Sequence, residues 1–232
     1  MTLTALGIAP DQCLIAGHWV APANGARLVL SNPSDGTALC DIARGDADDI
    51  DRAVLAAQDA LAGDWGRATA VERGRVLARI GQLVLENVDA LAQLEALDVG
   101  KPLTQARADV IALARYMEFY AGSANKLHGE TIPYLDGYTV YTLREAHGVT
   151  GHIIPWNYPM QIIGRSVGAA LATGNACVLK PAEEACLTAL AFGELAMRAG
   201  LPAGALNVVP GLGAEAGAAL TAHPGVQHIS FT

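Results

Sequence analysis

From residue 149 onward, two kinds of apolar segment alternate along the chain, and this alternation constrains the fold more than any other feature. Short β-rich runs predict strands, and longer runs with apolar residues every three or four positions predict helices. The predicted strands are VTGHII, NACVLK, ALNVVP and VQHISFT, and the predicted helices span 158–173, 183–200 and 213–222. Such alternation is typical of a parallel sheet whose connecting helices cover both faces. We therefore predict an α/β fold with an open, doubly wound, Rossmann-like parallel sheet.

The part of the chain before this unit has a different pattern. Residues 13–45 predict short strands separated by a strong turn, NPSDG, whereas residues 46–127 predict helices. Asp46 and Asp49 have the spacing of a capping box at the start of the first helix. Gly100, followed by Lys-Pro, is a stop signal for the third. The later predicted helices span about 69–86, 87–99 and 102–126.

Residues 131–149, TIPYLDGYTVYTLREAHGV, separate the two parts of the chain. Polar and apolar residues alternate there around Asp136-Gly137, which predicts a β-hairpin. Its second strand is expected to be long and β-rich. We therefore expect that strand to leave the main body and to pair elsewhere.

Composition excludes several classes of protein. Hydrophobic residues make up 52% of the chain and charged residues 16%, which excludes a disordered protein. The net charge of −8 and the lack of a basic cluster argue against nucleic acid or an anionic membrane as a partner. The most apolar stretch, 158–178, contains Arg165 and Asn175 and therefore favours a buried helix and strand over a membrane span. The first residues, MTLTALGIAPDQ, lack the features of a signal peptide, so we expect a cytoplasmic protein.

The four cysteines show neither CxxC spacing nor a Cys/His pattern, so we expect reduced thiols and no metal site. They are Cys13, Cys40, Cys177 and Cys186. Cys177 lies in NACVLK, which we interpret as a fully buried central strand. A thiol in such a strand is expected to act as a small hydrophobic residue and not as a nucleophile.

Open α/β sheets bind ligands at the carboxyl ends of their strands, and one such end carries a lysine and a carboxylate. Lys180 ends the strand NACVLK, and Glu183 is expected at the start of the next helix. Both can hydrogen-bond the vicinal hydroxyls of a ribose, and the carboxylate would repel a ribose 2′-phosphate, which favours NAD over NADP. The alternative is a surface lysine beside a glutamate favoured by the helix dipole.

Two further strand ends carry unusual residues. In 210-PGLGAEAG-217, the glycines would let the backbone approach a phosphate group, although a plain turn before a tightly packed helix explains them nearly as well. In 153-IIPWNYP-159, the Asn157 carboxamide is held between prolines and could donate to a developing oxyanion, worth about 3 kcal/mol. Trp156 could wall a pocket. Alternatively, Asn157 caps a helix that starts at Tyr158.

The combination of IIPWNYP, GNACVLKPAE, LPAGALNVVPGLG and HISFT resembles the NAD(P)-dependent aldehyde dehydrogenase superfamily. The N-terminal motifs CLIAGHWV, NPSDGT, EALDVGKP and RYMEFYAG fit the same family in the same order. The resemblance therefore covers essentially the whole chain. One small departure is Ala146, where the family usually has proline.

This resemblance implies a mechanism and residue roles. In the family, a cysteine thiolate attacks the aldehyde, hydride passes to NAD, and a glutamate-activated water hydrolyses the thioester. The implied oxyanion-hole residue is Asn157, whose side chain acts together with a backbone NH. The implied cofactor-binding residues are Ile153, Ile154, Pro155 and Trp156 along the cleft, Lys180, Pro181 and Glu183 at the ribose, and Gly211 and Gly213 toward the adenine end.

The resemblance also implies that the family's nucleophilic cysteine and general-base glutamate lie beyond Thr232. We therefore expect the amino-terminal portion of an NAD-dependent aldehyde dehydrogenase that is inactive by itself and forms a homo-oligomer, a dimer or a tetramer, when complete. The implied division is 1–130, strands and helices of a cofactor-binding domain, 131–149, an oligomerisation hairpin, and 150–232, a dinucleotide-binding portion. The alternative is a non-catalytic module that binds nucleotide or a partner protein.

Overall fold

The computed structural model describes residues 6–232, so the first five residues of the predicted segment 1–130 lie outside the described residues. Its strands are β1 (Cys13–Ile15), β2 (His18–Val20), β3 (Arg27–Ser31), β4 (Ala38–Ala43), β5 (Thr131–Ile132), β6 (Val140–Tyr141), β7 (Val149–Ile153), β8 (Ala176–Lys180), β9 (Leu206–Val208) and β10 (His228–Phe231). Its helices are α1 (Ala47–Ala62), α2 (Asp64–Arg67), α3 (Ala70–Glu86), α4 (Val88–Val99), α5 (Leu103–Ser123), α6 (Pro159–Ala172), α7 (Leu187–Arg198), the π-helical turn η2 (Gly213–Gly217) and α8 (Ala218–Ala222).

A six-stranded sheet forms the centre of the molecule, with the strand order β10-β7-β8-β9-β1-β2. The strands β10, β7, β8 and β9 are parallel, and β1 and β2 extend the sheet in antiparallel fashion beyond β9. The chain runs from β7 outward to β8 and β9 and then returns, so that β10 pairs with the other side of β7. Ligands bind open α/β sheets beyond the carboxyl ends of their strands at such a reversal.

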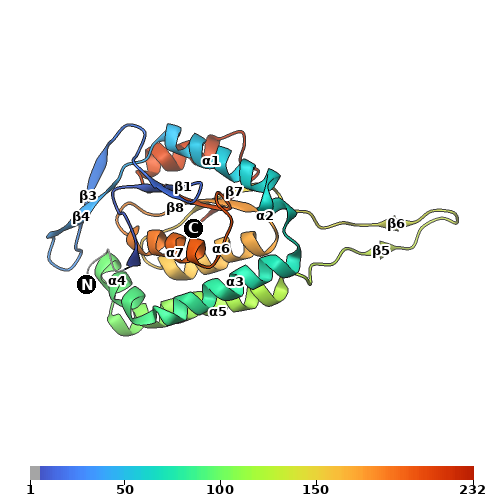
Figure 1. Ribbon diagram of the computed structural model, residues 1–232, viewed down its shortest axis with the longest axis horizontal. Coiled ribbons are helices and arrows are strands. Elements are labelled where there is room, and N and C mark those ends of the chain that lie inside the picture. The colour runs from blue at the N-terminus through green and yellow to red at the C-terminus, as the bar shows by residue number, and fades with distance from the viewer. Residues whose placement is uncertain (1–5) are drawn as a thin grey trace.

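Helices cover both faces of this sheet, which confirms the predicted doubly wound fold. On one face α1 packs on β7, β8 and β9 and also contacts η2 and α8. On the other face α6 packs on β7 and β8, and α7 packs on β9. The helices α3 and α5 form a further layer over α6 and α7 (Figure 1). This outer layer of helices needs close contacts, because a Cβ on Gly164 of α6 would lie 2.7 Å from Tyr116 Cδ2 of α5.

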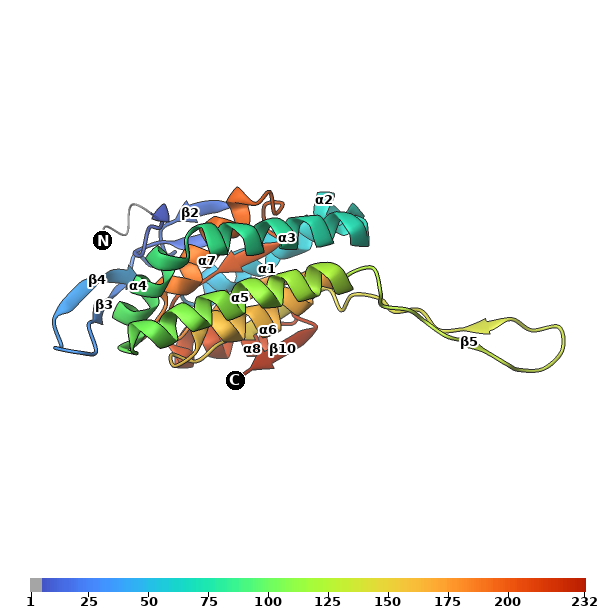
Figure 2. The same cartoon turned by 90° about the horizontal axis from the view of Figure 1, so that it is seen from below.

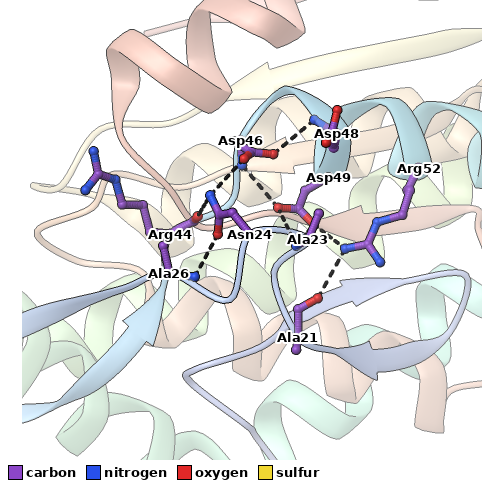
Figure 3. A network of polar contacts seen from close by, with 9 residues as sticks. All are labelled: Ala21, Ala23, Asn24, Ala26, Arg44, Asp46, Asp48, Asp49 and Arg52. Atoms are coloured by element: carbon purple, nitrogen blue, oxygen red, sulfur yellow. Dashed lines mark hydrogen bonds and ion pairs between the residues drawn. The ribbon is translucent and has the colours of Figure 1, made fainter.

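Local signals correctly predict where several helices begin and end. At the start of α1, Asp46 accepts a hydrogen bond from the Asp48 NH, and Asp49 accepts one from the Asp46 NH (Figure 3). Both halves of the predicted capping box are therefore present. At the end of α4, Gly100 adopts a left-handed conformation with φ 76°. A Cβ there would lie 2.7 Å from Pro33 Cγ, so the turn needs glycine.

Other helix boundaries differ from the prediction. α7 begins at Leu187 and not at residue 183, because Asp98 Oδ2 on α4 accepts the Leu187 NH at 2.8 Å and fixes the first turn there. Glu183 therefore lies in the turn between β8 and α7, not at a helix start. The predicted helix 213–222 begins as the π-helical turn η2 and continues as α8. The short helix α2 was not predicted.

The segment between α5 and β7 forms an arm that projects from the main body (Figures 1 and 2). Within it β5 and β6 pair in antiparallel fashion, with Thr131 opposite Tyr141 and Ile132 opposite Val140. The prediction of a long second strand was wrong, since β6 contains two residues. A strand needs a hydrogen-bonding neighbour, and in residues 6–232 only β5 lies beside this segment.

Candidate functional site

Lys180, Glu183 and Gly213 meet at the carboxyl edge of the parallel strands. Lys180 ends β8 and is only 2% exposed, and its Nζ donates to Glu183 Oε2 at 2.7 Å. The other carboxylate oxygen of Glu183 accepts the Gly213 NH at 3.3 Å. Glu183 therefore connects the end of β8 with the turn that follows β9.

This arrangement differs from the alternative of a surface lysine beside a helix-start glutamate. Lys180 is buried, and Glu183 precedes the first residue of α7. A Cβ on Gly217 would lie 4.0 Å from both the Ile153 and the Lys180 side chains, so η2 sits directly over the ends of β7 and β8. Packing thus fixes the lysine stem and leaves its ammonium group at the edge of the sheet.

Glu183 is held in its charged form. Burial opposes its ionisation, but the hydrogen bonds from Lys180 Nζ and from backbone NH groups outweigh burial, and they hold the pKa of Glu183 below its usual value. The side chain remains 28% exposed. A carboxylate that is ionised, fixed and partly open to solvent can accept hydrogen bonds from the hydroxyls of a ligand.

The two glycines predicted at this site have different surroundings. Gly211 is buried, and a Cβ there would lie 2.4 Å from the Gly45 carbonyl oxygen, so packing on the N-terminal segment explains the glycine. Gly213 is exposed, and no atom lies within 4 Å of the position of a Cβ. Of the two, only Gly213 leaves open space beside the backbone for a ligand.

The segment after β7 presents Asn157 to solvent between two exposed aromatic residues. Trp156 is 56% exposed and Tyr158 is 41% exposed. α6 starts with Pro159 and has no side-chain hydrogen bond at its cap, so Asn157 does not cap this helix. Within residues 6–232 the Asn157 carboxamide has no hydrogen-bond partner, which makes it available to a ligand.

A hollow of about 390 Å³ lies at this segment, where β10 returns beside β7. Its lining includes Pro155, Asn157 and Tyr158 from the β7–α6 connection and Thr232 after β10. The Thr232 NH donates to the Ile153 carbonyl at 3.3 Å, so the two strand ends are hydrogen-bonded at the rim. The predicted oxyanion donor thus faces a cavity at the reversal of the sheet, as expected for open α/β sheets.

The remaining predicted cleft residues lie at the ends of β7 and β8, next to Asn157 and the Lys180–Glu183 pair. Ile154 and Pro181 are buried, and Ile153 and Pro155 are partly buried. The Ile154 NH donates to the Lys180 carbonyl at 3.2 Å, so the ends of β7 and β8 are joined directly beneath the site.

The cysteines in this chain lack the surroundings of a nucleophile. Cys177 is fully buried in β8, as predicted, and burial raises its pKa to about 12. Burial also raises the pKa of Cys13 and of Cys186. Cys40 is partly buried, and desolvation raises its pKa to about 11. A thiol with a raised pKa carries little of the thiolate that attacks a carbonyl.

A buried ion cluster that was not among the predicted groups lies beneath Tyr158. Lys101 Nζ donates to Glu95 Oε1 at 3.0 Å and to Asp109 Oδ2 at 2.7 Å, and it lies 4.5 Å from the centroid of the Tyr158 ring. One signal was present in the sequence, since Asp109 interrupts the apolar face of α5 next to Val110. In the sequence, Lys101 belongs to a helix stop signal and to the motif EALDVGKP, and neither predicts a role for its charge.

Two kinds of feature are absent from residues 6–232. No group of three or more histidine, cysteine or acidic side chains is arranged to hold a metal ion. No helix there combines the length and the apolar character needed to cross a lipid bilayer.

Comparison with known proteins shows which family and which proteins the chain is similar to. The model of the Aldehyde dehydrogenase family matches residues 19–232. Hydroxyisobutyraldehyde dehydrogenase of Mycolicibacterium austroafricanum is 47% identical over 223 residues, which cover 96% of this chain and 44% of that protein.

Solved structures agree with this match. A Burkholderia cenocepacia protein assigned to the aldehyde dehydrogenases is 65% identical, with a TM-score of 0.94, over 95% of this chain and 46% of that one. The NAD+ complex of aldehyde dehydrogenase from Bacillus cereus is 38% identical, with a TM-score of 0.96, over 100% of this chain and 48% of that one. The chain therefore spans about half the length of each of these three relatives.

Proposed function

The chain belongs to the aldehyde dehydrogenase family, and from this premise we propose that the protein carrying it oxidises an aldehyde to a carboxylic acid with NAD as the hydride acceptor. The observation that supports the proposal is the pairing of two polar groups at neighbouring strand ends. Asn157 presents a carboxamide after β7, and the Lys180–Glu183 ion pair lies at the end of β8. The carboxamide can donate a hydrogen bond to an oxyanion, and the ion pair can bind the hydroxyls of a ribose.

The residues present fit a dinucleotide. Glu183 is ionised and partly exposed, and Gly213 borders open space, so a ribose has acceptors and room at this edge. Lys180 and Glu183 would hold the ribose hydroxyls, and Gly213 would lie beside the nucleotide. Trp156 and Ile153 would line the cleft. When bound, NAD takes up the hydride that leaves the aldehyde carbon.

The role of Asn157 follows from the charge that develops during attack on an aldehyde. As a nucleophile adds to the carbonyl carbon, the carbonyl oxygen gains negative charge. The Asn157 NH₂ can donate to that oxygen, and its segment is fixed by β7 on one side and by α6 on the other. A preorganised donor of this kind lowers the barrier by about 3 to 4 kcal/mol.

NAD is favoured over NADP by the charge of Glu183. The carboxylate would accept a ribose hydroxyl but would repel a 2′-phosphate at the same place. Lys180 reduces this repulsion, because its ammonium group contacts the same carboxylate at 2.7 Å. We therefore expect a preference for NAD and not a complete exclusion of NADP.

The 232 residues alone are expected to bind nucleotide without turning over aldehyde. Each cysteine of the chain has a raised pKa through burial, so none supplies a thiolate near neutral pH. The chain is mixed with NAD and either acetaldehyde or benzaldehyde, and NADH absorbance is followed. Steady NADH formation above that of a cysteine-free variant would contradict this expectation.

We further propose that the projecting arm joins copies of the protein into a dimer or a tetramer. Large apolar side chains along it are exposed: Leu127, Ile132, Tyr134, Leu135, Tyr138, Tyr141 and Leu143. Such a series on a two-stranded arm favours a protein partner, because soluble proteins rarely leave extended apolar surfaces uncovered.

The decisive test uses the protein at its natural length. We expect NAD-dependent NADH formation with an aldehyde, and we expect Asn157→Ala to lower kcat about 10²- to 10³-fold without changing NAD affinity. Asn125→Ala, at another exposed asparagine, is the matched control and should keep full activity. A folded protein of natural length that oxidises no aldehyde, or an Asn157→Ala variant with unchanged kcat, would overturn the proposal.

A further inference from the structure

A buried ion cluster lies directly beneath the segment that carries Asn157. Lys101 connects the end of α4 with the start of α5, and its side chain is 10% exposed. Its two partners, Glu95 on α4 and Asp109 on α5, are both 0% exposed. Lys101 is the only lysine or arginine within ion-pair distance of either carboxylate in residues 6–232.

The cluster contacts two residues that follow Asn157 in the chain, Tyr158 and Gln161. The ammonium group of Lys101 lies 4.5 Å from the centroid of the Tyr158 ring, within the range of a cation–π contact. Asp109 Oδ1 accepts a hydrogen bond from Gln161 Nε2, in the first turn of α6, at 2.7 Å. One ion pair thus holds both the residue after Asn157 and the helix that follows it.

These contacts replace the ones that a helix start usually has. The N-terminus of α6 has no side-chain cap, and the Asn157 carboxamide has no partner within the described part of the chain. Upstream, Ile154 is tied to β8 by its backbone NH. Downstream, Lys101 contacts Tyr158 and Asp109 accepts from Gln161. Arg165 adds a second link to α5, because it donates to Gln161 Oε1 at 2.8 Å and to the Tyr116 hydroxyl at 2.9 Å. The cluster therefore restrains the residue that follows Asn157 and the first turn of α6.

We propose that Lys101 is a positioning residue that, together with Asp109, holds the Asn157 carboxamide in place through Tyr158 and Gln161. Its effect on catalysis rests on the proposed function, in which Asn157 donates to the oxyanion. Its effect on the segment itself does not, so the two can be tested separately.

The first test measures hydrogen exchange of residues 156–163 in the natural-length protein. Lys101→Met removes the cation, and we expect at least about tenfold faster exchange there. Arg52→Met is a matched control, because Arg52 pairs with the fully buried Asp49 at α1, on the other face of the sheet (Figure 3). It should destabilise the protein without affecting this segment. Equal exchange of the segment in parent and Lys101→Met would overturn the proposal.

The second test is a double-mutant cycle on kcat per titrated active site. A displaced donor costs about 10- to 100-fold in kcat, so Lys101→Met should show this loss while the KM for NAD changes less than about twofold. In an Asn157→Ala background the same substitution should cost little more, because the group it positions is gone. Additive losses would overturn the proposal. An Asn157→Ala variant that keeps full activity would refute the oxyanion role instead, and the exchange data would then decide on positioning alone.

Loss of Lys101 leaves two buried carboxylates without a cation and could prevent folding. Gln161→Met is the gentler variant, because it removes the hydrogen bonds of the Gln161 side chain to Asp109 and Arg165 and keeps both ion pairs. We expect the same faster exchange in 156–163 and a smaller loss in kcat. Lys101→Arg keeps the charge, so its exchange rate in residues 156–163 and its kcat should be close to those of the parent. If Gln161→Met folds and exchanges like the parent, the proposal is wrong.

Discussion

At the scale of single residues, the Glu183 carboxylate is the group on which cofactor choice depends. Glu183→Gln keeps the shape and removes the charge. We expect the Kd for NAD to rise about tenfold, because replacing a charged acceptor by a neutral one weakens a hydrogen bond by roughly 1–1.5 kcal/mol. The ratio of NADP to NAD affinity should rise, because the 2′-phosphate no longer meets a carboxylate.

Isothermal titration with both nucleotides measures the two affinities. Glu184→Gln is the matched control, since Glu184 is the exposed neighbour of Glu183 and lacks its contacts. It should bind both nucleotides like the parent. An unchanged NADP-to-NAD ratio in Glu183→Gln would show that this carboxylate does not select the cofactor.

The thiols supply a second prediction at this scale. Burial raises the pKa of Cys177 to about 12, and desolvation raises that of the partly buried Cys40 to about 11. At pH 8 the folded chain should react slowly with iodoacetamide, at Cys40 alone. The rate at Cys40 should increase as the pH rises toward 11, because the thiolate is the reactive form. Peptide mass spectrometry identifies the labelled site, and rapid labelling of Cys177 before unfolding would contradict the prediction.

At the scale of elements, α7 depends on a carboxyl group from another helix. Asp98 on α4 accepts the Leu187 NH, and burial, with the charge of Glu95 in addition, raises the pKa of Asp98 to about 8. In the unfolded chain an aspartate titrates near about 3.9. Between about pH 4 and pH 8 the folded state therefore holds a proton that the unfolded state has lost. The free energy of unfolding should decrease as the pH rises through this window.

Asp98→Asn removes this titration and keeps an oxygen that can accept the Leu187 NH. We expect the variant to lose less stability than the parent between pH 5 and pH 8, by a few kcal/mol, as measured by urea unfolding at several pH values. Asp64→Asn, at a side chain that is 87% exposed, should follow the parent. Parallel curves for Asp98→Asn and the parent would refute the role of Asp98.

The ends of the helices show which features of the fold the sequence can predict. The start of α1 and the end of α4 follow from signals within a few residues, namely the Asp46–Asp49 box and Gly100. The start of α7 depends on Asp98, which lies 89 positions before Leu187, so no local pattern could reveal it. The short β6 is a related case, because strand length depends on a pairing partner.

The candidate site also combines groups that the sequence could predict with groups that it could not. Lys180 and Glu183 are three positions apart at one strand end, and their association could be predicted from that spacing. The cluster around Lys101 could not, because Glu95, Asp109 and Gln161 come from three helices that only the fold brings together. Asn157 was predictable as a candidate, since the flanking prolines mark it, but its lack of a capping bond required the structure.

At the scale of the whole molecule, the arm carries a series of large apolar side chains that the main body does not cover. Tyr134, Tyr138 and Leu143 are 68%, 69% and 70% exposed. The β5–β6 ladder has two residue pairs, so the arm gains little stability from its own hydrogen bonds. Contact with another copy would bury these side chains and extend the ladder, which is the physical reason for the proposed homo-oligomer.

We therefore predict that the assembly depends on the arm and not on exposed apolar residues in general. Replacing Tyr138, Tyr141 and Leu143 together by serine should lower the particle mass of the natural-length protein, measured by light scattering, to that of a smaller assembly or a monomer. Val29→Ser is the matched control, because Val29 on β3 is 65% exposed and lies outside the arm. It should leave the mass unchanged. The site around Asn157 belongs to the main body, so the serine variant should still bind NAD. If the triple variant keeps the parent's mass, the arm does not join the copies.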